Sequence, residues 1–286
     1  MLQSTIDKIC FKGFEFYIKR DDLLGEINGN KARKLAFYFS QVYSKNQRFI
    51  SYGGIQSNAL ATLSIFCLKR NIKLIFVCRK IPNFLKENPC GNYALALKNK
   101  VEIIETNNIN LKKYALSLCN KEDIFIEQGI ANLNAELGYK ELANEIKEQS
   151  IDLNLEFDIF LPSGTGTSAA FLAKHSKFKI FTCSCIGDES YLKKQILELI
   201  QDYDFSNLEI LKSNKKYHFG KPYREIYQLY KELKQECNIE FDLLYDMIGL
   251  NIVLQRKWEK PLLYIHQGGI LGNVSMLQRY AFKGFK

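Results

Sequence analysis

Residues that could do chemistry are concentrated in four turns rich in glycine and polar side chains. The turn with the most hydrogen-bond donors reads Ser-Gly-Thr-Gly-Thr-Ser from Ser163 to Ser168. Its glycines let several backbone N–H groups converge at the start of a helix, and the hydroxyls of Thr165, Thr167 and Ser168 add donors. The pattern predicts a phosphate-binding turn, although an ordinary strand-to-helix turn with a Ser/Thr cap has the same composition. No G-K-[ST] follows and the glycine spacing is not G-x-G-x-x-G, which excludes a Walker loop and a dinucleotide fingerprint.

A second turn begins with Gly53 and Gly54, which permit close approach of a ligand to the backbone. Ser57 or Asn58 could cap the helix that follows. Gln56, Ser57 and Asn58 together are more than a cap requires, so the turn predicts a site for a carboxylate or hydroxyl ligand.

A third turn places Lys31 between Gly29-Asn30 and an apolar helix, and Arg33 and Lys34 follow. A solvated surface lysine is the ordinary interpretation. However, neighbouring cations and desolvation both lower the pKa of a lysine, as a nucleophile that attacks a carbonyl requires.

The fourth turn, His266 to Gly269, follows an apolar strand. His266 fits a core histidine whose hydrogen bonds are satisfied. Neither acids nor cysteines are patterned around His175, His218 or His266, so we predict no metal site and no catalytic triad.

Short apolar segments alternate with helical periodicity along most of the chain, which predicts an α/β protein with open parallel sheets. Segments such as Ile72 to Cys78 are apolar almost throughout, as in strands covered on both faces. Ligands of such sheets bind beyond the carboxyl ends of the strands, where the four turns lie. The expected strands are 48–52, 72–78, 101–105, 124–127, 157–161, 178–185, 208–211 and 262–266, and the expected helices are 57–70, 92–98, 111–119, 135–147, 167–174, 191–200, 223–236, 247–257 and 273–281.

Composition limits the classes of protein. The 286 residues include 40 Lys+Arg and 31 Asp+Glu, a net charge of +9, but the lysines are spread along the chain rather than clustered. Solvated lysine-rich faces explain this better than nucleic-acid binding, and the field could attract a small anion. No apolar run reaches the ~20 residues that cross a bilayer, and Met1 to Phe16 lacks a signal-peptide pattern, so we expect a cytoplasmic protein without membrane contact. Eight scattered cysteines lack a C-x-x-C pair and most lie in apolar stretches, which favours a structural role over metal or redox chemistry.

Together, the four turns, Lys19-Arg20-Asp21-Asp22 and Glu136-Leu137-Gly138-Tyr139 resemble the pyridoxal-phosphate enzymes of the tryptophan synthase β fold. In particular, they are similar to the family of 1-aminocyclopropane-1-carboxylate deaminase and D-cysteine desulfhydrase. The motifs occur in the family's order over nearly the whole chain, and the most specific are G-N-K-x-R-K-L at 29–35 and G-G-x-Q-S-N at 53–58.

The resemblance implies fold type II of the pyridoxal-phosphate enzymes: two open, mostly parallel, twisted sheets flanked by helices, with the active site in a cleft between domains. Residues 1–35 and 136–286 would form the large cofactor-binding domain, and residues 36–135 the small α/β domain. The family also suggests a homodimer.

The resemblance further implies roles for individual residues. Lys31 matches the lysine that bonds covalently to pyridoxal 5′-phosphate, and Asn58 the residue beside the cofactor's ring hydroxyl. Ser57 matches the group that meets the substrate carboxylate and acts as a nucleophile, and Gln56 beside it is assigned to substrate binding. The matching phosphate-binding residues are Gly164, Thr165, Gly166 and Thr167.

Tyr245 falls where the family has an active-site tyrosine, and Asp246 matches the acidic partner of the pyridine nitrogen. A carboxylate there keeps the ring protonated, so that it accepts electrons from a substrate carbanion. Phe219 stands where the family has a second pocket tyrosine. Further departures are Ala59-Leu60-Ala61, Gln267 and Glu127-Gln128-Gly129.

The implied substrate is a small amino acid, and the implied enzyme is a hydrolase or lyase that releases ammonia. With 1-aminocyclopropane-1-carboxylate the products would be 2-oxobutanoate and ammonia. With D-cysteine, β-elimination would give pyruvate, ammonia and sulfide. A homologue that binds the cofactor without catalysis is the alternative from another class.

Overall fold

The computed structural model describes residues 3–201 and 203–285, and the chain divides into two compact units. Unit 1 comprises Met1–Ala36 and Leu133–Lys286, and unit 2 comprises Phe37–Asn132. The chain thus changes unit at 36/37 and 132/133, where the resemblance suggests 35/36 and 135/136. Among the described residues, no helix is long and apolar enough to cross a bilayer.

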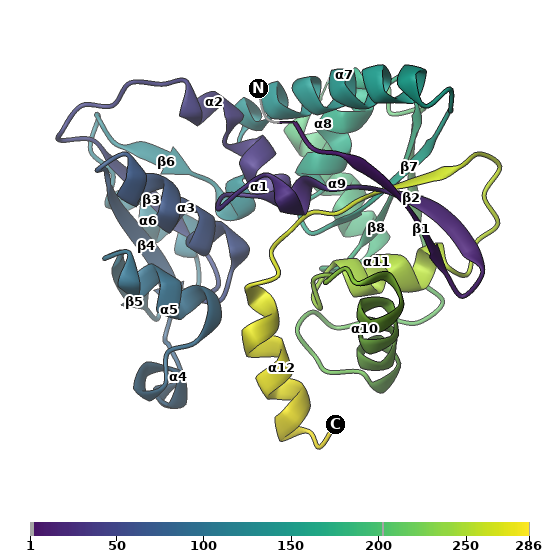
Figure 1. Ribbon diagram of the computed structural model, residues 1–286. Helices are drawn as coiled ribbons and strands as arrows, with labels where there is room; N and C mark the ends of the chain where they lie inside the picture. Colours follow the sequence, from purple (N-terminus) through teal and green to yellow (C-terminus); the bar gives the residue numbers. More distant parts are fainter. Residues whose placement is uncertain (1–2, 202, 286) are drawn as a thin grey trace. The chain divides into compact units, whose positions relative to one another are not determined.

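Unit 1 contains a six-stranded sheet with the order β1-β2-β10-β7-β8-β9 (Figure 1). Its first two strands pair antiparallel and the other neighbours pair parallel. The strands are β1 (Ile6–Phe11), β2 (Phe14–Lys19), β7 (Asp158–Ser163), β8 (Lys179–Ser184), β9 (Leu208–Leu211) and β10 (Leu262–Ile265).

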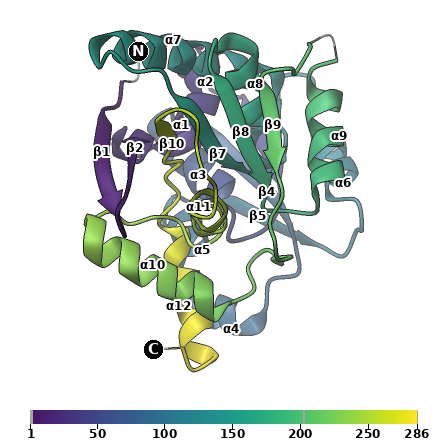
Figure 2. The same ribbon diagram turned by 90° about the vertical axis from the view of Figure 1, so that its right-hand side faces the viewer.

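Helices cover both faces of this sheet because successive strand residues point to opposite faces. In β7, Ile159 and Leu161 pack into one core with α7, α8 and α9, whereas Phe160 packs into the other with α10 and α11. Figure 2 shows α7 and α10 on opposite sides of the strands. The helices are α7 (Glu136–Asp152), α8 (Thr167–His175), α9 (Glu189–Leu199), α10 (Arg224–Cys237), α11 (Asp246–Val253) and α12 (Gly272–Phe282).

Unit 2 contains a four-stranded parallel sheet with the order β5-β4-β3-β6. Helix α6 contacts β3 and β4, and α3 contacts β4 and α5. The elements are β3 (Arg48–Tyr52), α3 (Asn58–Lys69), β4 (Lys73–Arg79), α4 (Asn83–Glu87), α5 (Gly91–Lys98), β5 (Glu102–Thr106), α6 (Leu111–Ser117) and β6 (Ile124–Ile126), and α2 (Ala36–Phe39) crosses the boundary between the units.

The predicted fold class is confirmed, and strands 48–52 and 208–211 have the predicted bounds. The β1–β2 hairpin was not predicted. Its turn residues Lys12 and Gly13 both have positive φ, as a two-residue hairpin turn requires, but lysine is an unusual residue for that position. Helix α11 ends at Val253 rather than 257, and the carbonyl of Val253 accepts from Arg256 N at 3.2 Å and from the Trp258 indole at 3.1 Å. Helix α7 continues five residues past the predicted end at Lys147, to Asp152.

Candidate active site

Three of the four chemically promising turns follow neighbouring strands of unit 1. The segment with Lys31 follows β2 through the short helices η1 (Asp21–Leu23) and α1 (Gly29–Lys34). His266 and Gln267 follow β10, and the turn from Ser163 follows β7. Because β2, β10 and β7 are adjacent and parallel, these segments meet at one edge of the sheet.

Helix α1 has only six residues and depends on tertiary contacts for its position. Gly29 has φ +61°, and a Cβ there would lie 1.8 Å from the backbone oxygen of Gln267. No larger residue fits at this position without moving the backbone. The close approach allows Asn30 N to donate to Gln267 O at 3.1 Å.

A buried ion cluster fixes the other side of α1. Arg33 is fully buried and forms ion pairs with Asp21 at 2.7 Å and with Glu145 of α7 at 2.8 Å. Buried Lys19, at the end of β2, pairs with the same Glu145. Two cations thus match two carboxylates, and the cluster ties α1 to β2 and α7 two residues from Lys31.

The amine of Lys31 has the properties of a nucleophile. Its Nζ donates to Asn30 Oδ1 at 3.0 Å, and although part of the side chain is accessible, the amine itself is desolvated. Burial lowers the pKa of Lys31 to about 8, against the opposing effect of the Asp242 carboxylate. A substantial fraction of the amine is therefore neutral near pH 8, the form that attacks a carbonyl carbon.

The turn after β7 has the construction of an anion site. Gly166 has φ +72° and is the N-cap of α8, and among the described residues no side chain caps the N–H groups of the first turn. The hydroxyls of Thr165 and Thr167 lie 2.9 Å apart beside these donors. Uncapped helix N–H groups together with two hydroxyls suit a phosphate group.

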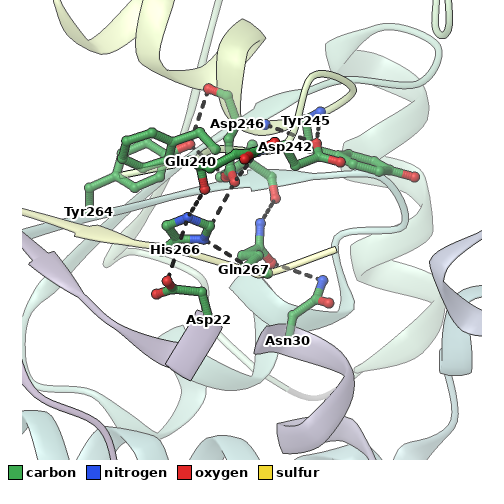
Figure 3. A network of polar contacts seen from close by, with 12 residues as sticks. Asp22, Asn30, Glu240, Asp242, Tyr245, Asp246, Tyr264, His266 and Gln267 are labelled. Carbon is green, nitrogen blue, oxygen red and sulfur yellow. Dashed lines mark hydrogen bonds and ion pairs between the residues drawn. The ribbon is translucent and has the colours of Figure 1, made fainter. Parts of the chain in front are cut away.

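Side chains join the Lys31 segment to this turn. Asn30 Nδ2 donates to Gln267 Oε1 at 3.0 Å, and Gln267 Nε2 donates to Pro162 O, just before the turn (Figure 3). The hydroxyl of Tyr139 lies 2.7 Å from Ser168 Oγ and 3.4 Å from Asn30 O. Asn30 is thereby connected to both ends of the turn.

Two buried aspartates lie next to these segments (Figure 3). Asp246 accepts from the hydroxyl of Tyr264 at 2.9 Å, and its other oxygen accepts from Asp242 N at 3.3 Å. One oxygen of Asp242 accepts from the backbone N–H groups of residues 244, 245 and 246, whereas the buried Oδ2 has no hydrogen-bond partner among the described residues. Burial raises the pKa of Asp242 to about 6, and it also raises the pKa of Asp246 well above its ordinary value. The pair therefore tends to retain a proton, and a nearby cationic or N–H group would stabilise its ionised form.

His266 is fully buried and has a partner on each ring nitrogen. Its Nε2 lies 2.9 Å from Glu240 O, which can only accept, so Nε2 carries the proton and Nδ1 accepts from Gly268 N at 3.1 Å. Burial also lowers the pKa of His266, so the ring is neutral although Asp246 Oδ2 lies 3.7 Å away. The ring orders the turn after β10.

Tyr245 and Phe219 pack beside the glycine turn. Their ring centroids are 5.1 Å apart, and a Cβ on Gly164 would lie 3.1 Å from Tyr245 Cε1. Burial raises the pKa of Tyr245, which keeps its hydroxyl protonated and able to donate. Unit 1 therefore brings together Lys31, the phosphate-type turn Gly164, Thr165, Gly166 and Thr167, and the side chains of Phe219, Tyr245 and Asp246.

Unit 2 holds the remaining predicted residues at the carboxyl end of β3. Ser57 is the N-cap of α3, and its Oγ accepts from Leu60 N at 3.2 Å, which leaves the hydroxyl proton to donate. The Gln56 amide is occupied on both sides: Nε2 donates to Cys90 O and Oε1 accepts from Tyr93 N. Its assignment to substrate binding stays a prediction, and the observed contacts are structural.

Comparison with known proteins supports the fold. No family model matches the chain, and neither does any curated protein. A solved structure described as an ACC deaminase homologue superposes with a TM-score of 0.80 and 24% identity, covering 98% of this chain and 92% of that one. The chain has the fold of this deaminase homologue.

Other solved structures share the fold at lower similarity. A hydrogen sulfide-producing enzyme from Fusobacterium nucleatum has a TM-score of 0.65 and 17% identity, with 94% of this chain and 97% of that one covered. A fungal L-serine ammonia-lyase from Rhizomucor miehei has a TM-score of 0.66 and 12% identity, with 98% and 97% covered.

Two residues that contact Asp246 were not predicted as site residues: Asp242 and Tyr264. Tyr264 reaches Asp246 across 18 positions of the chain, and such a contact leaves no local pattern. Only Asp242, four residues before Asp246, had a visible signal, since a second acid at that spacing precedes a helix.

Proposed function

We propose that the protein is a pyridoxal-phosphate-dependent deaminating enzyme that acts on a small amino acid, with 1-aminocyclopropane-1-carboxylate as the first candidate substrate and 2-oxobutanoate and ammonia as products. The observation that carries the proposal is the pairing in unit 1 of an amine with a pKa of about 8, at Lys31, with a phosphate-type turn. The chain Asn30–Gln267–Pro162 connects the two. A ligand that carries both an aldehyde and a phosphate group needs an amine and a phosphate site close together, and both lie here at the same end of the sheet.

The donor set fits this cofactor. Thr165, Gly166 and Thr167 would hold the phosphate, and Lys31 would bond to the aldehyde carbon. Asp246, with Asp242 beside it, would face the ring nitrogen, because a buried acid pair is stabilised by an N–H partner. When bound, pyridoxal phosphate supplies an electron sink for the carbon that carries the substrate's amino group.

Three side chains of the protein would bind the substrate and transfer protons. The Lys31 amine would take or return a proton at a substrate carbon, and a pKa of about 8 suits both directions near neutral pH. Ser57, at the start of α3, would meet the substrate carboxylate and serve as the nucleophile. Tyr245 would donate from a hydroxyl that burial keeps protonated.

A second candidate activity is β-elimination from D-cysteine, giving pyruvate, ammonia and sulfide. Phe219, in place of a tyrosine, removes one hydroxyl that opening of the cyclopropane ring would use, and this favours the elimination. Asp246 favours the deaminase. The descriptions of the similar solved structures support a deaminase or lyase, and they do not support a hydrolase. A homodimer, a cytoplasmic location and the absence of nucleic-acid and membrane partners are proposals that rest on the resemblance and the composition.

The test is the keto acid released when the purified protein with pyridoxal phosphate receives each amino acid separately. We expect 2-oxobutanoate from 1-aminocyclopropane-1-carboxylate, and no product from the Lys31→Ala variant. Pyruvate and sulfide from D-cysteine alone would establish the second candidate. Cofactor binding without product from either would identify a non-catalytic homologue.

A further inference from the structure

A buried asparagine outside the predicted site contacts the turn that carries Ser57 and Asn58. Asn92, in the first turn of α5, is 1% exposed. Its Nδ2 donates at 2.8 Å both to the backbone oxygen of Gln56 and to Asn58 Oδ1. All of these residues belong to unit 2, so helix α5 holds the turn from within its own unit.

These contacts determine the direction in which the Asn58 amide points. A backbone oxygen can only accept, so the Asn92 atom that faces Gln56 O must be the amino nitrogen. The Asn58 atom 2.8 Å from that same nitrogen must then be an oxygen. The amino group of Asn58 consequently points away from Asn92, and among the described residues it has no hydrogen-bond partner. Half-buried Asn58 thus presents its amino group as a donor to a ligand.

We propose that Asn92 is a positioning residue. It fixes the Asn58 carboxamide so that the Asn58 amino group donates to the anionic oxygen at position 3 of the cofactor's ring. The inference rests on the proposed function, which supplies the cofactor. Without Asn92 the Asn58 amide could rotate by 180° and present its own oxygen to a negatively charged atom. Binding would then include the free-energy cost of ordering the amide.

The experiment compares two cofactors that differ by one atom. Dissociation constants of the apo protein are measured for pyridoxal 5′-phosphate and for 3-deoxypyridoxal 5′-phosphate, which lacks the oxygen at position 3 of the ring. The preference is the ratio of the two dissociation constants, corrected for the same ratio of a free lysine amine in solution. Wild-type protein should prefer pyridoxal phosphate by a further factor of roughly 10 to 100, the range for a hydrogen bond to a charged group. Asn92→Ala should reduce this preference to within about threefold, and Asn92→Asp should remove it, because its carboxylate would accept from Asn58 and turn the amide around.

The matched control is Asn99→Ala. Asn99, at the other end of α5, donates from Nδ2 to Ser64 Oγ of α3 at 2.9 Å, so this variant also loses an asparagine hydrogen bond between α5 and α3. It should keep the wild-type preference. A purely structural effect would weaken the binding of both cofactors equally in every variant. The proposal instead requires that only the binding of pyridoxal phosphate is weakened.

The outcomes separate the inference from the proposed function. If wild-type protein binds pyridoxal phosphate but shows no extra preference, or if both Asn92 variants retain the preference, the inference is overturned and the proposed function stands. Wild-type protein that does not bind pyridoxal phosphate removes both. Should the Asn92 variants not fold, ¹⁵N spectra of wild-type protein decide: we expect slow solvent exchange of the Asn92 amide protons, and a shift of the Asn58 amide protons with pyridoxal phosphate but not with the deoxy analogue. Rapid exchange at Asn92 or equal shifts with the two cofactors would overturn the inference.

Discussion

The buried ion cluster around Arg33 predicts a large loss of stability when one cation is removed. In Arg33→Met, the Asp21 carboxylate, 1% exposed, keeps the Ser4 hydroxyl at 2.6 Å but loses its guanidinium partner. Glu145 keeps Lys19. Leaving one carboxylate buried without a cation costs about 3–5 kcal/mol.

Arg20→Met is the matched control. Arg20 lies one residue from Asp21 and also pairs with two carboxylates, Asp7 and Asp22, both at 2.8 Å, but its side chain is 14% exposed, Asp7 39% and Asp22 10%. Because water can replace Arg20 at Asp7 and only in part at Asp22, we expect an intermediate loss of about 1–2 kcal/mol.

The assay is urea unfolding of both apo variants at pH 7, followed by fluorescence and by circular dichroism. Arg33→Met should lower the free energy of unfolding by at least about 1 kcal/mol more than Arg20→Met does. It should also weaken binding of pyridoxal phosphate in the folded fraction, because the cluster positions the helix that carries Lys31. Equal losses of stability in the two variants would refute the argument that burial makes the cluster strong.

Three other predictions concern the site. The rate at which apo protein forms its visible band with pyridoxal phosphate should rise with pH through a midpoint near 8, where Lys31 becomes neutral, and a midpoint above 10 in stopped-flow absorbance would contradict this. Gly166→Ala should destabilise the protein and weaken binding of inorganic phosphate, because its Cβ would lie 2.5 Å from a neighbouring side chain at φ +72°. Gly13→Ala, at φ +78° with no atom within 4 Å, should be destabilised without loss of phosphate binding in calorimetry. Tyr264→Phe should lower the free energy of unfolding by about 1–3 kcal/mol at pH 7, because it removes the hydroxyl that donates to the buried Asp246 carboxyl group; an unchanged free energy in urea unfolding would exclude this account.

The parts of the fold and site that the sequence predicts are those with local patterns. The strand 48–52 and the glycine turns after β3, β7 and β10 follow from apolar runs and small residues close in the chain. The placement of Lys31 beside a phosphate-type turn follows from the family resemblance, because β2, the strand before Lys31, was not predicted.

What the sequence does not predict depends on distant partners. Arg33 meets Glu145 112 positions away, and Gln56 directs its amide to Cys90 and Tyr93 rather than outward. Cys183 and Cys185 fall on one face as the strand period requires, with sulfurs 3.9 Å apart, but the contact of Cys185 Sγ with Tyr245 O does not follow from that period.

The central claim is that Lys31 carries the cofactor. Reduction of the cofactor-loaded protein with borohydride, followed by proteolysis and mass spectrometry, locates the modified lysine directly. We predict that the pyridoxyl group is on the peptide that contains Lys31 and that the Lys31→Ala variant carries none. A pyridoxyl group on Lys34 or any other lysine, or no modification at all, would contradict the claim.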